Sequence, residues 1–94
     1  MLRRYEDSLD LLLDRLFLDG AASVRWDDVY VWFGAERLSK GSYREMLKRW
    51  EDLCIGHHGY EVAPEVSVLS SKYFMLLRRE AFPDEELTPL RDWT

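Results

Sequence analysis

Apolar residues in the first part of the chain recur at the spacing of a helix. Within residues 2–18 they lie at intervals of three and four positions: Tyr5, Leu9, Leu12, Leu13, Leu16 and Phe17. This spacing puts all of them on one side of a helix with 3.6 residues per turn. Asp19 and Gly20 follow, and glycine is a common helix stop. The pattern predicts a helix of about four turns over residues 2–18.

A shorter helix is predicted after an extended entry that begins at Ser23. Asp27 and Asp28 supply negative charge, which suits the positive end of the helix dipole in a first turn. Gly34 can end this helix by adopting a left-handed conformation. The boundaries that follow are Trp26–Phe33.

A third helix carries the clearest amphipathic pattern. Ser42 and Glu45 have the spacing of a capping box, in which each side chain accepts a backbone N–H from the other residue. The helix is therefore predicted to run from about Tyr43 to Cys54. Its apolar side consists of Tyr43, Met46, Leu47, Trp50, Leu53 and Cys54.

Beyond a turn at residues 56–59, β-branched and aromatic residues predict extended structure over 60–62, 66–68 and 72–78. Ser70-Ser71 is the expected tight connection of a β-hairpin, with Tyr73 and Phe74 opposite Val66 and Val68. An alternative is a helix from Ser70 or Ser71 to Phe82, because residues 75–81 are mostly good helix formers. We favour the strand.

The order of these elements is helix, short strand, helix, helix and hairpin. With the runs SVRWDDV (23–29) before Gly34, LSKGSYREMLKRWEDL (38–53), GYEV (59–62) and SKYFML (71–76), the chain resembles the winged helix-turn-helix superfamily over about residues 3–79. The resemblance implies a mainly α fold with a small β-hairpin. It also implies that the third helix is the recognition helix and that the wing tip lies near Ser70-Ser71-Lys72.

The resemblance divides the chain into a winged-helix domain over residues 1–79 and an acidic C-terminal tail over 80–94. Pro83, Pro89 and the acidic run 84–86 predict an irregular tail. Leu87, Leu90 and Trp93 give it apolar anchors that can fold back on the domain.

The charge distribution points to one docking surface. Residues 36–50 hold five basic and two acidic side chains, net +3, whereas the whole chain is −5. A local reversal of sign on one helix is typical of a surface that binds phosphates or an acidic protein. The first hypothesis is a DNA-binding transcriptional regulator, without cofactor or metal, that contacts double-stranded DNA through Arg37, Lys40, Ser42, Arg44, Lys48, Arg49 and Lys72.

The rest of the composition supports a different class of partner. Residues 1–20 and 80–94 are each net acidic, and aromatic residues make up 14% of the chain. A small acidic domain with surplus aromatics is also typical of a protein-binding adaptor, or of a phage-type inhibitor of a host defence complex (anti-CRISPR-like). An ordinary solvated helix face is a further interpretation of the basic residues.

The first helix carries two leucines on its otherwise charged side. Leu11 and Leu18 are seven residues apart and lie opposite the side with Leu9, Leu13 and Leu16. If they form a contact, the simplest is a twofold homodimer through this helix. Arg4 or Arg15 of one chain would then meet Asp7 or Asp14 of the other.

Catalytic and metal-binding chemistry is not expected. His57 and His58 are adjacent in a turn without a third ligand at useful spacing. Cys54 lies on an apolar helix side with no orienting carboxylate in view, so an enzyme is unexpected. No apolar run reaches the length of a membrane span, and a single cysteine gives no internal disulfide. We expect one cytoplasmic domain that acts by binding.

Overall fold

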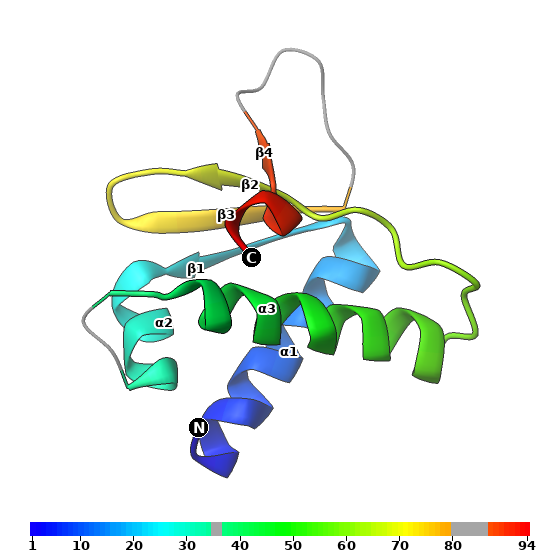
Figure 1. The fold of residues 1–94 in the computed structure, drawn as a ribbon, viewed down its shortest axis with the longest axis horizontal. Coiled ribbons are helices and arrows are strands. Elements are labelled where there is room, and N and C mark those ends of the chain that lie inside the picture. Colours follow the sequence, from blue (N-terminus) through cyan, green and yellow to red (C-terminus); the bar gives the residue numbers. More distant parts are fainter. Residues whose placement is uncertain (35–36, 80–86) are drawn as a thin grey trace.

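The computed structural model describes residues 1–34, 37–79 and 87–94. In chain order they form α1 (Arg3–Asp19), β1 (Ala21–Arg25), α2 (Trp26–Phe33), α3 (Lys40–Glu51), the π-helical turn η1 (Asp52–His57), β2 (Ser67–Ser70), β3 (Phe74–Arg78), β4 (Thr88–Pro89) and the 3-10 turn η2 (Leu90–Trp93). The helices lie below a small antiparallel sheet in Figure 1, and α3 crosses α1. This layout is compatible with a winged helix. No described helix is long and apolar enough to cross a membrane.

The first two helices form as their sequences predict. α1 ends at Gly20, which adopts φ 81° and donates its N–H to the Leu16 carbonyl. α2 ends at Gly34 with φ 64°, and its N–H bonds to Tyr30. A side chain at either glycine would strain this left-handed backbone, so both positions favour glycine.

The sheet has the order β1-β3-β2-β4, with all neighbours antiparallel. In β3, Met75 and Leu77 are buried and alternate with less buried neighbours. Met75 pairs with Val24 of β1, and Leu77 pairs with Val68 of β2. The strand is therefore the correct interpretation of residues 74–78, while residues 80–82 of the helical alternative lie outside the described residues.

The hairpin turn differs from the prediction. Ser71 Oγ accepts the Phe74 N–H at 3.1 Å, and the Ser71 N–H donates to the Phe74 carbonyl at 2.9 Å. These bonds close a turn around Lys72 and Tyr73, not around Ser70-Ser71. The register follows from this turn, so the predicted pairing of Tyr73 and Phe74 with Val66 and Val68 is wrong.

The strand predicted at residues 60–62 is absent. These residues form bends and irregular backbone, and Val62 is 79% exposed. The side chains of residues 60–62 are all exposed, so this segment has no buried side that could pack in a sheet.

The last described residues fold back on the body of the protein. Thr88 and Pro89 pair with Val68 and Ser67, and so add an edge strand that the sequence pattern did not predict. Leu90 is buried and donates its N–H to the Val66 carbonyl at 2.8 Å. The apolar anchors of this segment therefore do fold back, whereas Pro83 and the acidic run 84–86 lie outside the described residues.

Trp50 lies at the centre of the core. Its side chain is fully buried, and the centre of its ring lies 6.2 Å from the centre of the Phe17 ring of α1. The indole Nε1 donates a hydrogen bond of 2.8 Å to the Pro64 carbonyl. One side chain therefore joins α3, α1 and the segment that leads into the sheet.

Replacement of Trp50 by alanine should lower the free energy of unfolding by about 3–5 kcal/mol, because it opens a large cavity. Urea denaturation followed by circular dichroism measures the loss. Val31→Ala, at an exposed position of α2, is the control and should change stability by about 0.5 kcal/mol or less. Equal unfolding midpoints for Trp50→Ala and the wild type would show that this account of the core is wrong.

Candidate nucleic-acid interface

The start of α3 positions the predicted basic residues. Ser39 is the N-cap, and its Oγ accepts the Ser42 N–H at 3.3 Å. The predicted capping box is therefore wrong, because Ser42 lies inside the helix and the Glu45 carboxylate accepts a hydrogen bond from Arg49. The helix starts at Lys40 and so begins one turn earlier than predicted.

The outward side of α3 carries a stripe of positive charge. Lys40, Arg44 and Lys48 are exposed and lie four residues apart, which places them on one side of the helix. Lys40 and Lys48 make no hydrogen bond or ion pair with any described residue, and the same holds for exposed Arg37 at the entry to the helix. We call Arg37, Lys40, Arg44 and Lys48 the basic stripe.

Arg44 differs from the other members of the basic stripe. Its Nε donates a hydrogen bond of 3.1 Å to the Thr94 carbonyl oxygen. Beside it, the rings of Tyr43 and Trp93 meet edge to face at 5.0 Å. The segment after β4 therefore lies along one flank of α3 and engages one of its cations.

Arg49 does not join the basic stripe. Its guanidinium bonds three carboxylates: Nε to Glu45 at 2.9 Å, one terminal nitrogen to Asp10 at 3.1 Å, and the other to Glu6 at 2.8 Å. Only 21% of the Arg49 side chain is exposed. Two of these acids belong to α1, so Arg49 ties α3 to α1. We call this group of four side chains the Arg49 clamp.

The electrostatics of the Arg49 clamp favour the charged guanidinium. Partial burial works against the charge, but the bonds to Asp10 and Glu45 outweigh it and raise the pKa of Arg49 above its ordinary value. The positive charge of Arg49 is thus paired with carboxylates of the same chain.

The remaining predicted contacts lie at the edges of this surface. Lys72 is exposed in the hairpin turn, with its Nζ 5.4 Å from the centre of the Tyr73 ring. Ser42 is half-buried, and its Oγ lies 3.4 Å from that of Ser39. Lys72 can therefore reach a ligand from the hairpin, whereas Ser42 is engaged at the helix cap.

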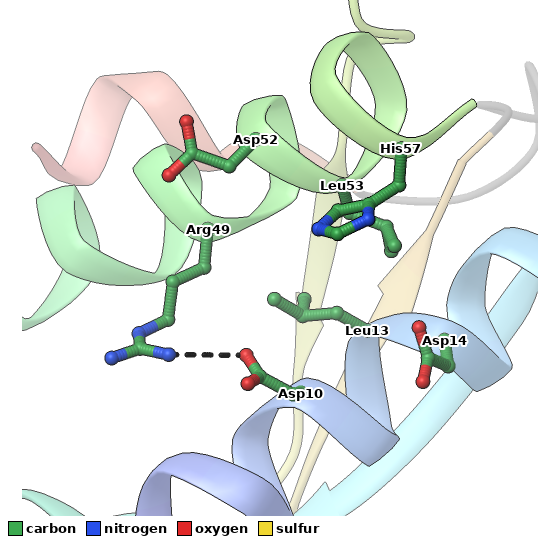
Figure 2. Close-up of a pocket in the computed structure, with 7 residues that line it drawn as sticks. All are labelled: Asp10, Leu13, Asp14, Arg49, Asp52, Leu53 and His57. Atoms are coloured by element: carbon green, nitrogen blue, oxygen red, sulfur yellow. Dashed lines mark hydrogen bonds and ion pairs between the residues drawn. The ribbon is translucent and has the colours of Figure 1, made fainter. Parts of the chain in front are cut away.

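An acidic cleft lies between α1 and the end of α3. Figure 2 shows the residues that line it, with the bond from Arg49 to Asp10 drawn as a dashed line. Its volume is about 490 Å³, and it is lined by Asp10, Leu13, Asp14, Arg49, Asp52, Leu53 and His57. Three carboxylates beside an already neutralised guanidinium disfavour a phosphate. Within residues 1–34, 37–79 and 87–94, no group of three or more His, Cys, Asp or Glu side chains could hold a metal ion.

Cys54 and His58 both pack against other side chains of the protein. Cys54 is fully buried, and this burial raises the pKa of its thiol against a smaller opposing effect of Arg79. His58 stacks on Phe17 with ring centres 3.8 Å apart. A buried neutral thiol is a poor nucleophile at neutral pH.

The predicted dimer residues lie on the outward side of α1. Leu11 and Leu18 are 61% and 69% exposed, as their spacing predicts. Arg4 donates a hydrogen bond of 3.0 Å to the Tyr5 hydroxyl and lies over that ring. Arg15 is exposed and makes no hydrogen bond or ion pair with any described residue.

Comparison with known proteins adds no relative. No family model, no curated protein and no solved structure matches the chain.

Sequence reasoning missed two features of this surface. Ser39 was overlooked because Ser39 and Ser42 are both competent caps, and only Ser42 has a glutamate three residues on. Glu6 and Asp10 share one side of α1 at the four-residue spacing, but nothing in a local pattern connects them with Arg49, about forty residues away.

Arg49→Ala should lower the free energy of unfolding by about 1–2 kcal/mol, because it leaves three neighbouring carboxylates without their shared cation. The adjacent Lys48→Ala removes the same charge from an exposed, unpaired position and should change stability by about 0.5 kcal/mol or less. Urea denaturation of both variants provides the comparison. Equal stabilities would show that the Arg49 clamp does not hold α1 to α3.

Proposed function

We propose that this chain is a winged-helix domain that binds double-stranded DNA and acts as a transcriptional regulator. The observation that carries this proposal is the basic stripe, in which Arg37, Lys40 and Lys48 are exposed and unpaired among the described residues. α3 follows α2 as the next element of the chain. Cations on the outward side of the second helix of such a pair can contact a DNA groove and its flanking phosphates.

The order of elements supports the same proposal. β1 precedes α2 and α3, and β2 and β3 follow as a hairpin whose turn carries exposed Lys72. Trp26 ties this turn to α2, because its Nε1 donates to the Ser71 carbonyl at 2.9 Å. In the proposed complex α3 enters the major groove, and the hairpin turn contacts an adjacent phosphate as a wing.

Fewer residues are proposed to contact DNA than the sequence alone suggested. Lys48 and Arg44 approach base edges, while Lys40, Arg37 and Lys72 contact phosphates. Arg44 must first exchange its bond to Thr94 for one to DNA. Arg49 takes no part, because its charge is already paired in the Arg49 clamp.

The net charge of −5 is compatible with this proposal. Salt screens charges over roughly 10 Å at 0.1 M, so the acidic groups of the cleft weaken phosphate contacts on the outward side of α3 less than their number suggests. Few cations remain for the contact, so affinity should be modest and its slope against salt should be shallow, because the slope grows with the number of phosphates contacted.

A protein-binding adaptor or inhibitor is the second candidate. Two observations favour it. Arg44 and Arg49 are each bonded to other groups of the chain, to Thr94 and to Glu6 among others. Large apolar side chains also lie at the surface, such as Tyr73 and Phe74, which are 61% and 47% exposed. An acidic surface with exposed aromatics suits a protein partner.

Lys48→Ala should weaken binding to a selected duplex by about 1–3 kcal/mol if Lys48 contacts a base. Lys40→Ala should weaken binding less and lower the slope of log affinity against log salt by about one, as expected for one lost phosphate contact. Fluorescence anisotropy with labelled duplexes over a salt series measures both effects.

Arg3→Ala is the matched control, since it removes the same charge from the exposed start of α1 and should leave affinity and slope unchanged. Absence of binding to a random-sequence duplex pool at low salt would remove the DNA proposal and leave the protein-binding candidate. Equal losses for Arg3→Ala and Lys40→Ala would mean that binding does not use α3.

A further inference from the structure

An open groove on the far side of α1 from the Arg49 clamp has an apolar floor with polar and charged side chains around it. Its volume is about 440 Å³, and its walls come from α1, β1, α2 and the start of β3. Leu11 and Phe74 line it and are 61% and 47% exposed, and Leu12, Val24 and Trp32 complete the apolar lining. Arg15 lines it as well, and its charge is unpaired among the described residues.

The outward ridge of α1 runs along this groove. Asp7, Leu11, Arg15 and Leu18 follow one another at intervals of four, four and three residues, and all four are exposed. Asp7, like Arg15, makes no hydrogen bond or ion pair with any described residue. The ridge therefore presents a leucine between one exposed negative and one exposed positive side chain.

We propose that a second copy of this chain docks on the ridge and groove, with its α1 antiparallel to the first and Leu11 at the twofold axis. Asp7 and Arg15 each lie four residues from Leu11, about 6 Å along the helix axis. A twofold axis at Leu11 therefore places Asp7 of each copy beside Arg15 of the other, and both pairs form at once.

The charge pattern selects this arrangement over its parallel counterpart. A parallel pair in register would put Asp7 beside Asp7 and Arg15 beside Arg15, and such like-charge contacts are costly. In the antiparallel pair Leu18 lies opposite the aliphatic stem of Arg4, which can cover it while the guanidinium stays in water.

The groove completes the contact. Leu11 belongs to both the ridge and the groove wall, so Leu11 of the second copy arrives at the mouth of the groove that Phe74 and Trp32 line. The same apolar patch is covered on both copies, as a twofold interface requires. This inference concerns α1 and does not rest on DNA binding by α3.

Charge exchange tests the arrangement. Asp7→Arg or Arg15→Asp alone would replace both attractive pairs with like-charge pairs and should raise the dimer dissociation constant about tenfold or more. The double variant Asp7→Arg with Arg15→Asp exchanges the charges and should restore dimerisation. Sedimentation equilibrium over a concentration series measures the constants, and circular dichroism shows that each variant is folded.

Glu61→Arg is the matched control, because it makes the same change of charge in an exposed loop and should leave the dissociation constant unchanged. Leu11→Glu combined with Leu18→Glu should give a folded monomer. A wild-type protein that is monomeric at about 100 µM would overturn the proposal and leave the groove to a partner of other sequence. A dimer that neither single reversal weakens, or that the double variant fails to restore, would overturn this arrangement.

Discussion

Burial of Trp50 is the constraint on which the rest of the surface depends. Its ring is in contact distance of Phe17 of α1, and its indole nitrogen is bonded to Pro64, so the rotation of α3 about its own axis is fixed. Successive residues of a helix differ by roughly 100° around the axis. With Trp50 inward, Arg49 faces sideways toward α1, while Lys48 faces away from the core. Two adjacent basic residues thereby acquire different roles.

This division of roles explains how an acidic chain keeps a local positive surface. Arg49 bonds Glu6 and Asp10 of α1, so its charge goes into the contact between helices. Lys40 and Lys48 stay exposed and unpaired among the described residues, which leaves their charge available to a ligand. A simple count over residues 36–50 therefore overstates the exposed positive charge of α3, because Arg49 is paired within the protein.

Local patterns predicted what local forces determine. The apolar spacing of α1, the left-handed glycines after α1 and α2, and the alternation in β3 were all readable, because each depends on neighbours a few residues away. The predicted position of the hairpin turn was wrong because two adjacent serines, Ser70 and Ser71, offered more than one way to close it. The bonds between Ser71 and Phe74 select one of them.

Long-range pairing could not be predicted in the same way. β4 contains Pro89 and carries no strand pattern of its own, so it exists through its pairing with β2 and the burial of Leu90. Two of the three partners of Arg49 lie on α1, far away in sequence, and the bond from Arg44 to Thr94 spans half the chain. The composition of the candidate site thus depends on how α1 and the last residues pack around α3.

The most direct measurement of the central claim is an NMR titration of ¹⁵N-labelled protein with short duplex DNA at low salt. The account predicts that shifted amide signals cluster at residues 37–48 and at the hairpin turn around Lys72, while signals from the outward side of α1 stay in place. Shifts confined to α1 and its groove, or no shifts at any DNA concentration, would contradict a DNA-binding role for the outward side of α3.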